Sequence, residues 1–294
     1  MATLNEWIAG SRPRTLPVAI APVAAGTGAA YALGDGNPAY ALLALLVSLL
    51  LQIGVNFAND YSDGIRGTDE VRVGPVRLVG QGLAVPSSVK LAAFICFGAA
   101  ALCGLALVAL SGTWWLLIAG VLAIIAAWKY TGGEHPYGYM GLGEVFVFVC
   151  FGLFATLGTT YTQAGSIDGS AVAAAVGVGA IACAILVVNN LRDIPGDTVS
   201  GKRTLAVRIG DGATRKLFTA MFLLALVAVI VSGIQRPWSL IALVGLAPAA
   251  QSARTVAGGA KGRDLIPPLA STGVTILVYG VLFGLGLFLD HQLG

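Results

Sequence analysis

Two clusters of aspartate and asparagine are the parts of this sequence best suited to chemistry. In each cluster an asparagine precedes an aspartate by four residues, and side chains three or four residues apart share one face of a helix. Each cluster is therefore predicted to form a stripe of oxygen ligands, the second one on a helix that must continue past Pro195. The two stripes consist of Asn56, Asp60 and Asp63, and of Asn189, Asp193 and Asp197.

Oxygen ligands of this kind predict a magnesium diphosphate site. Grouped carboxylates repel one another unless a positive charge lies between them, and Mg²⁺ binds through one or two carboxylates together with substrate phosphates. The chain has only 2 histidines, which leaves no histidine-based metal site. Four aspartates and a diphosphate ester carry about seven negative charges, so we expect two Mg²⁺ ions plus basic side chains.

The basic side chains that could complete this site lie in the neighbouring loops. Tyr130 is either an anchor at the membrane interface or part of a diphosphate clamp. The basic candidates are Lys202, Arg66, Arg72, Arg77 and Lys129.

The elements that position these residues are apolar helices. Hydrophobic residues make up 57% of the 294 residues and charged residues only 11%, against roughly 25% in soluble domains, which excludes an ordinary soluble enzyme. Continuous apolar runs are typical of membrane helices rather than of barrel strands. The sequence therefore predicts an all-α, polytopic membrane protein with nine transmembrane helices, at about 16–34, 38–58, 90–110, 113–128, 142–162, 171–190, 216–233, 238–252 and 266–289.

Basic residues predict the orientation of these helices. With nine spans, 16 of the 17 Lys and Arg fall on one face of the membrane, and Arg236 alone falls on the other. Cytoplasmic loops hold the excess of Lys and Arg, so we expect a plasma-membrane protein with its N-terminus in the cytoplasm and its C-terminus outside. Both acidic stripes then lie at the cytoplasmic face.

The spacing of the two stripes indicates an internal duplication. Asn56 and Asn189 are 133 residues and four spans apart, which is typical of a parallel repeat. We expect one domain, 1–294, in which helices 1–4 (16–128) and helices 5–8 (142–252) are related and helix 9 (266–289) is extra. The duplication would bring the stripes face to face across a central, cytoplasm-facing cavity.

At these residues the chain resembles the UbiA family of intramembrane prenyltransferases. The resemblance implies that both stripes bind a prenyl diphosphate through Mg²⁺, that their four aspartates and Lys202 carry out catalysis, and that Asn56 and Asn189 are also ligands. The segments 7–17, 74–79 and 130–133 resemble the branch that prenylates 1,4-dihydroxy-2-naphthoate, with loss of CO₂, to give demethylmenaquinone. One departure is Gly67, where the family often has another aspartate; Asp69 follows two residues later.

Residues that hold the aromatic acceptor are harder to select. Glu144 either stabilises the start of a helix or contacts this substrate. The candidates are Arg14, Arg192, Glu144 and Tyr161.

Two alternatives remain at this point. A prenyltransferase of the same fold could use 4-hydroxybenzoate, haem or a sugar lipid as acceptor. A transporter is disfavoured, because transporters place charges near the bilayer midplane and here the middle of every predicted span lacks charge. The expected partners are a polyprenyl diphosphate, a small aromatic acid and the lipid bilayer, with no nucleic acid and with the oligomeric state left open.

Overall fold

Prolines and short polar side chains mark where the long helices begin. The computed structural model describes residues 2–67 and 76–293. Proline starts α2 (Pro17–Ala32), α3 (Pro38–Ile65) and α4 (Pro86–Ser111), at positions where its missing N–H costs no hydrogen bond. The side chain of Asp168 caps α8 (Gly169–Val199) by accepting a hydrogen bond from Ala171 N at 2.8 Å.

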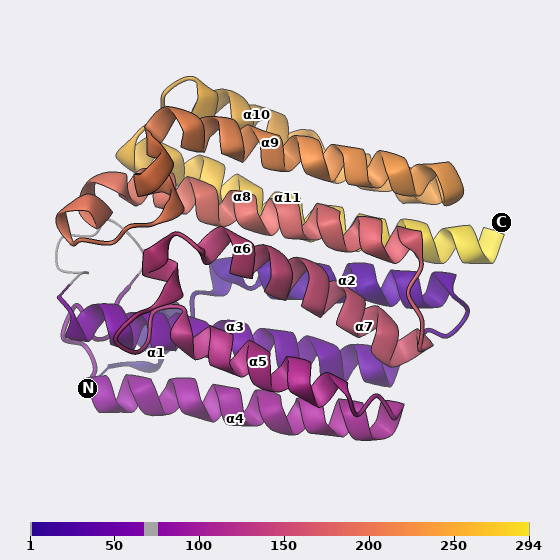
Figure 1. Cartoon of the computed structure of the whole chain (residues 1–294), viewed down its shortest axis with the longest axis horizontal. Helices are drawn as coiled ribbons and strands as arrows, with labels where there is room; N and C mark the ends of the chain where they lie inside the picture. Colours follow the sequence, from indigo (N-terminus) through magenta and orange to yellow (C-terminus); the bar gives the residue numbers. More distant parts are fainter. Residues whose placement is uncertain (1, 68–75, 294) are drawn as a thin grey trace.

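The part of the chain that the structure describes is helical and contains no strand, as expected from the sequence. Figure 1 shows the long helices lying side by side, with the two chain ends at opposite ends of the bundle. The remaining helices of the described chain are α1 (Leu4–Gly10), α5 (Leu116–Lys129), α6 (Gly143–Val147), α7 (Ala155–Ala164), α9 (Leu205–Gln235), α10 (Ala247–Ala257) and α11 (Ile266–Leu293), and the short or irregular turns are η1 (Pro13–Thr15), η2 (Tyr137–Met140), η3 (Phe148–Phe154), η4 (Pro237–Leu246) and η5 (Gly262–Leu265).

The described helices depart from regular geometry in several places, including Gly210, whose backbone (φ 80°, ψ 170°) interrupts α9. The predicted span 142–162 forms α6, a π-helical segment η3 and α7 in succession. α8 continues through Pro195 to Val199, which confirms the condition placed on the second stripe. π-Helical turns are rare and are frequently found at functional sites.

Seven helical segments of the described chain are long and apolar enough to cross a membrane. The count becomes eight if the α1–η1 segment and the adjoining α2, which meet at a bend of 49°, together form one span. α5, which matches the predicted span 113–128, has only 14 residues and is not counted among them. The chain is therefore a multi-pass membrane protein.

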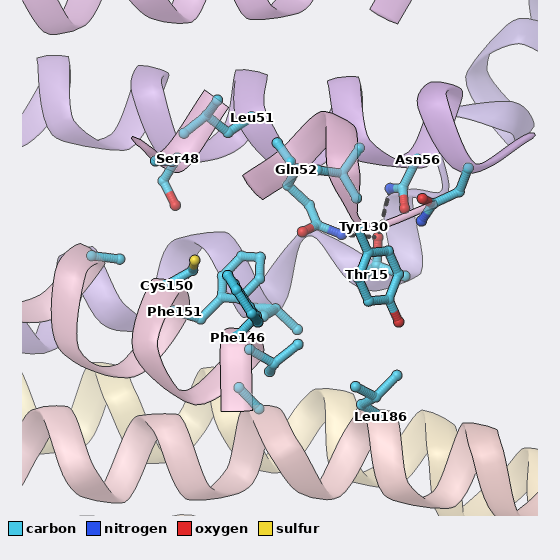
Figure 2. A pocket seen from close by; sticks show the side chains of 18 of the residues that line it. Thr15, Ser48, Leu51, Gln52, Asn56, Tyr130, Phe146, Cys150, Phe151 and Leu186 are labelled. Atoms are coloured by element: carbon cyan, nitrogen blue, oxygen red, sulfur yellow. Dashed lines mark hydrogen bonds between the residues drawn. The ribbon is translucent and has the colours of Figure 1, made fainter. Parts of the chain in front are cut away.

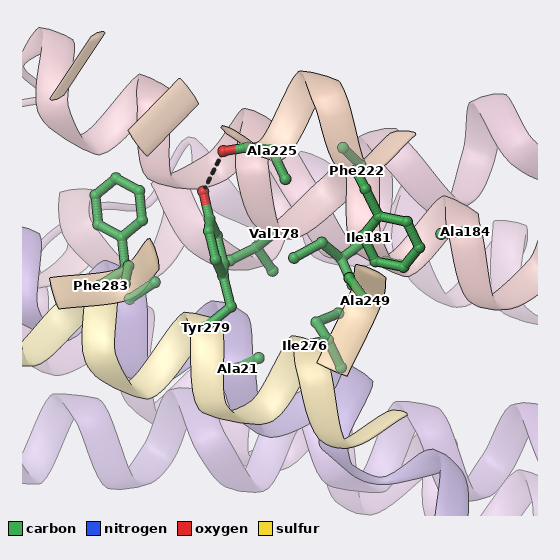
Figure 3. Close-up of a cluster of buried hydrophobic side chains, with 14 of the residues drawn as sticks. Ala21, Val178, Ile181, Ala184, Phe222, Ala225, Ala249, Ile276, Tyr279 and Phe283 are labelled. Carbon is green, nitrogen blue, oxygen red and sulfur yellow. Dashed lines mark hydrogen bonds between the residues drawn. The ribbon is translucent and has the colours of Figure 1, made fainter. Parts of the chain in front are cut away.

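α8 lies at the centre of the largest buried cluster, between α2, α9 and α11. Figure 3 shows Val178 and Ile181 of α8 packed against Phe222, Ile276 and Tyr279. The Tyr279 hydroxyl donates a hydrogen bond to the Ala225 carbonyl of α9 at 2.9 Å. This pairing satisfies a buried polar group that would otherwise be costly in an apolar core.

Glycines let the helices of this core approach closely. A Cβ atom on Gly28 of α2 would lie 2.0 Å from the Gly284 carbonyl oxygen of α11. Small residues at such contacts are how helices associate inside a bilayer, where burial of apolar surface gives little driving force. The glycine content of the sequence therefore has a packing explanation here.

The end of the bundle opposite the acidic stripes carries one ion-pair network. Arg236, after α9, pairs with Asp290 at 3.5 Å and with Asp168 at 3.8 Å. The structure brings these three residues together from the start of α8, the end of α9 and the end of α11.

We predict that Gly28→Ala destabilises the protein, because the added methyl group would collide with the backbone of α11. A loss of about 2 kcal/mol should lower the Tm by roughly 5 °C in a thermal unfolding experiment in detergent. Gly98→Ala is the matched control, since Gly98 is exposed on α4 and its added Cβ would meet nothing within 4 Å. Equal Tm values for the two variants would contradict the close packing of α2 on α11.

Candidate functional site

A cavity of about 1260 Å³ runs between the helices and connects the two acidic clusters. Residues of α3, α8, the 130–139 loop and the segment before α2 line its polar end. Figure 2 shows Thr15, Gln52, Asn56 and Tyr130 around this end, with Leu186 on the wall across from Tyr130 and Phe151 further along the cavity.

The first cluster divides between the cavity and the protein interior. Asn56 and Asp63 line the cavity, and Asn56 donates hydrogen bonds to Ser11 O at 2.8 Å and Thr15 Oγ1 at 2.9 Å. Asp60 is fully buried and instead accepts hydrogen bonds from the backbone N–H groups of Leu78 and Val79 at 2.7 and 3.1 Å. Asp60 therefore ties the turn after residue 76 to α3.

The second cluster divides in the same way. Asn189 and Asp197 line the cavity, whereas Asp193 is buried beside it. Arg192 forms two hydrogen bonds to the Asp193 carboxylate, at 2.7 and 2.9 Å, and a third to Asn189 Oδ1 at 2.9 Å. In each cluster the asparagine and the last aspartate thus reach the cavity, while the middle aspartate is not part of its lining.

One ion pair connects the two clusters. The Lys202 ammonium, just beyond α8, lies 3.0 Å from Asp63 Oδ1 of α3, and both side chains are buried. Lys202 also lies over the ring of Tyr139 at 4.6 Å, and the Tyr139 hydroxyl donates a hydrogen bond to Asp63. Arg203, the next residue, is exposed and does not line the cavity. Lys202, which was selected from the sequence, thus lies at the cavity beside Asp63.

The other basic candidates differ in where they lie. Arg77 and Tyr130 line the cavity. Arg66 instead donates hydrogen bonds to the backbone carbonyls of Thr131 and Gly133, and so holds the 130–133 loop. Lys129 is exposed and outside the lining. Arg72, like Asp69, lies outside the described residues.

The four residues predicted to hold the aromatic acceptor also differ in whether they line the cavity. Arg14 and Arg192 line the cavity. Glu144 is buried behind the wall and accepts a hydrogen bond from Asn190, which does line the cavity. Tyr161 is not part of the lining and packs edge-on against Trp115, with ring centroids 5.3 Å apart.

Several polar residues of the lining were not selected from the sequence. Asn59, next to Asp60, accepts a hydrogen bond from Thr131 at 2.7 Å, and Arg12 adopts a left-handed backbone conformation with φ 54°. Such strained conformations are concentrated at functional sites. Tyr139 had no sequence signal of its own, because only folding of its loop places it on Asp63.

The 130–139 loop is held in place by Tyr137. Its ring stacks on Phe146 of α6 at 3.9 Å, and its hydroxyl donates a hydrogen bond to the Ala126 carbonyl of α5 at 2.8 Å. Burial raises the pKa of this hydroxyl, so it remains a neutral donor. The loop that carries Tyr130 and Tyr139 is thereby fixed to both flanking helices.

The donor set at the polar end suits a magnesium ion that shares its ligands with a substrate. Asp63, Asp197 and Asn189 offer the oxygen ligands that Mg²⁺ prefers. Within residues 2–67 and 76–293, no three acidic, histidine or cysteine side chains are grouped closely enough to hold an ion. Oxygen atoms of a bound phosphate would complete the coordination, which is how Mg²⁺ is usually bound.

Beyond the polar end the cavity becomes apolar. Its wall there includes Val47 and Leu51 of α3, Leu107 of α4 and Phe154 of η3. The cavity can therefore hold a molecule with an anionic head and a long hydrocarbon tail.

Comparison with known proteins agrees with this geometry. The family model described as the UbiA prenyltransferase family matches residues 19–258. The chain is 52% identical over 281 residues to the 1,4-dihydroxy-2-naphthoate octaprenyltransferase of Mycobacterium tuberculosis, covering 96% of each chain. It is 37% identical over 296 residues to the protein of the same name from Escherichia coli, covering 98% of this chain and 96% of that one.

A solved structure shares the fold. It is that of a UbiA homolog from Archaeoglobus fulgidus bound to DMAPP and Mg²⁺, with a TM-score of 0.61 and 15% sequence identity. The similarity covers 96% of this chain and 99% of that chain.

We predict that Asp60→Ala lowers the stability of the protein. Removing the carboxylate of Asp60 relieves charge repulsion but leaves the buried backbone N–H of Leu78 and the partly buried N–H of Val79 without their acceptor. At about 1–3 kcal/mol for each unsatisfied group, the Tm should fall by at least roughly 5 °C. Asp35→Ala, in an exposed loop, is the control and should leave the Tm unchanged. An unchanged Tm for Asp60→Ala would mean that repulsion dominates at this residue.

Proposed function

This chain belongs to the UbiA prenyltransferase family, and on that basis we propose that it transfers a polyprenyl group from polyprenyl diphosphate to 1,4-dihydroxy-2-naphthoate with loss of CO₂. The observation that carries the proposal is the Asp63–Lys202 pair, which joins both acidic clusters where an apolar cavity becomes polar. The names of the relatives at 52% and 37% identity support the choice of acceptor.

The polar end binds the diphosphate. Lys202, Arg77 and Arg192 bring positive charge to the lining, and each can contact phosphate oxygens. Asp63, Asp197 and Asn189 would hold Mg²⁺ together with those oxygens, and we propose two ions because one leaves a large excess of negative charge. Bound Mg²⁺ would stabilise the negative charge of the departing diphosphate.

The reaction then needs little help from a base. As the C–O bond of the allylic diphosphate breaks, Lys202 and its neighbours stabilise the electrons that leave with the phosphate. The acceptor ring, activated by its own hydroxyls, attacks the allylic carbon. When attack occurs at the carbon that bears the carboxylate, loss of CO₂ returns a bonding pair to the ring and no proton has to be removed. The product of this redox-neutral step is the quinol form, demethylmenaquinol; its conversion to demethylmenaquinone is a separate reaction that needs an external two-electron oxidant.

The apolar part of the cavity holds the polyprenyl chain and keeps water from the cation.

We also propose that nine segments cross the bilayer: the seven longer spans, α5, and the bent α1–α2 pair. The balance of basic residues supports a plasma-membrane protein with a cytoplasmic N-terminus, an outer C-terminus and the polar end of the cavity open to the cytoplasm. The 133-residue spacing of the stripes supports two related four-helix units.

A direct assay tests the proposal. Purified protein is incubated with Mg²⁺, a labelled polyprenyl diphosphate and a panel of acceptors that includes 1,4-dihydroxy-2-naphthoate and 4-hydroxybenzoate. We expect prenylated product and one CO₂ per transfer with the naphthoate, and no product in EDTA. Faster transfer to 4-hydroxybenzoate, or turnover in EDTA, would overturn the acceptor or the metal requirement respectively.

The two adjacent basic residues after α8 should differ sharply in this assay. Lys202→Ala removes a buried ammonium from the cavity, whereas Arg203→Ala removes an exposed side chain outside it. We expect kcat/KM for the diphosphate to fall by about 10²-fold in Lys202→Ala and to change little in Arg203→Ala. The loss should be the same with every acceptor, because ionisation precedes attack. Equal small losses in both variants would mean that the basic loop acts only as a diffuse positive field.

A further inference from the structure

Two buried polar side chains outside the aspartate clusters meet at the cavity wall. Asn190 of α8 is 7% exposed and lines the cavity, and Glu144, in the first turn of α6, is 8% exposed and lies behind it. Asn190 Nδ2 donates a hydrogen bond to Glu144 Oε1 at 3.0 Å. The other carboxylate oxygen, Glu144 Oε2, is buried without a hydrogen-bond partner in the described part of the chain. Burying a carboxylate with so little compensation is costly, and packing alone does not require it.

This contact fixes the orientation of the Asn190 amide. Its nitrogen Nδ2 donates to Glu144 Oε1, so the amide oxygen lies on the other side of the group, away from this carboxyl oxygen. Among the described residues, no donor forms a hydrogen bond to the Asn190 carbonyl oxygen. This oxygen is also not one of the fully buried side-chain atoms that lack a partner, so it is not enclosed by protein. Asn190 therefore offers a hydrogen-bond acceptor to the cavity.

Aromatic and apolar side chains form the adjoining wall. Phe146 of α6, Tyr130 and Leu186 all line the cavity, and Figure 2 shows them around the same part of it. Leu186 precedes Asn190 by four residues, so both lie on the same face of α8. A Cβ atom on Gly143 would lie 3.1 Å from Leu186 and 3.5 Å from Tyr130, which places these two side chains close together.

We propose that Asn190 binds a ring hydroxyl of the aromatic acceptor through its carbonyl oxygen, and that Glu144 is the positioning residue that holds this oxygen toward the cavity. The ring lies against Tyr130, Phe146 and Leu186. A hydroxyl that donates to Asn190 becomes more electron-rich, which favours attack by the ring and fixes which carbon faces the donor. This inference rests on the proposed function and identifies the residues that recognise a hydroxylated aromatic acid.

A comparison of variants and acceptor analogues tests the assignment. Asn190→Leu removes the acceptor atom, and 1-hydroxy-2-naphthoate and 4-hydroxy-2-naphthoate each lack one hydroxyl of the dihydroxy compound. We expect Asn190→Leu to lower kcat/KM for 1,4-dihydroxy-2-naphthoate by about 10-fold and to leave the KM of the polyprenyl diphosphate unchanged. With the analogue that lacks the contacted hydroxyl, wild type and Asn190→Leu should react equally.

Variants of Glu144 test whether this residue positions the Asn190 amide or affects only the folding of the protein. Glu144→Gln keeps an oxygen that can accept from Asn190 Nδ2 and should retain most of the acceptor preference, whereas Glu144→Leu should lose it as Asn190→Leu does. Cys183→Ala is the matched control, because the Cys183 thiol donates a hydrogen bond to the Glu144 backbone carbonyl at 3.1 Å but does not line the cavity. Its acceptor preference should be unchanged.

The outcomes distinguish a failure of this inference from a failure of the proposed function. If wild-type protein prenylates no hydroxynaphthoate, the proposed function fails. If wild type is active but Asn190→Leu loses the same factor with all three acceptors, or raises the KM of the diphosphate, the hydroxyl contact is wrong. A Glu144→Leu variant with normal acceptor preference would remove Glu144 from its positioning role.

Discussion

The constraint on which this structure depends is that carboxylates gathered among apolar helices must each be given a compensating partner. Three of the four motif aspartates show how this is achieved: Asp60 accepts two backbone N–H groups, Asp63 pairs with Lys202, and Asp193 pairs with Arg192. Taking a charge out of water costs several kcal/mol unless a partner compensates for it. Among these contacts, the Asp63–Lys202 pair links α3 to the segment after α8, and Asp60 links α3 to the turn after residue 76. The cavity forms where the two helix ends are drawn together.

The same constraint divides the residues of each cluster between two roles. Asn56 and Asp63 in one cluster, and Asn189 and Asp197 in the other, reach the cavity, seven and eight residues apart. The middle aspartate of each cluster holds a turn or a neighbouring arginine instead. A substrate with its own negative charges would enter a site whose basic residues are already fixed by these contacts, which limits the reorganisation needed for catalysis.

Much of this arrangement could be predicted from the types and spacing of residues. Apolar runs located the long helices, and helical spacing predicted a shared face for each cluster, but it did not predict that Asp60 and Asp193 lie outside the cavity lining. The lengths of α5 and of the bent α1–α2 pair could not be predicted, because helix ends depend on packing and capping. The roles of Tyr139 and Asn190 could not be predicted either. Each depends on a hydrogen bond to a residue distant in sequence: Tyr139 to Asp63, and Asn190 to Glu144.

The central claim is that Asp63 and Lys202 join the two halves of the site through one buried ion pair, and a double-mutant cycle tests it most directly. Thermal unfolding without substrate is measured for Asp63→Asn, Lys202→Met and the double variant. Each single change removes one member of the buried Asp63–Lys202 pair, so we predict that each lowers stability and that the double variant loses less than their sum by about 1 kcal/mol or more. Additive losses would contradict the account, because the two side chains would then not interact.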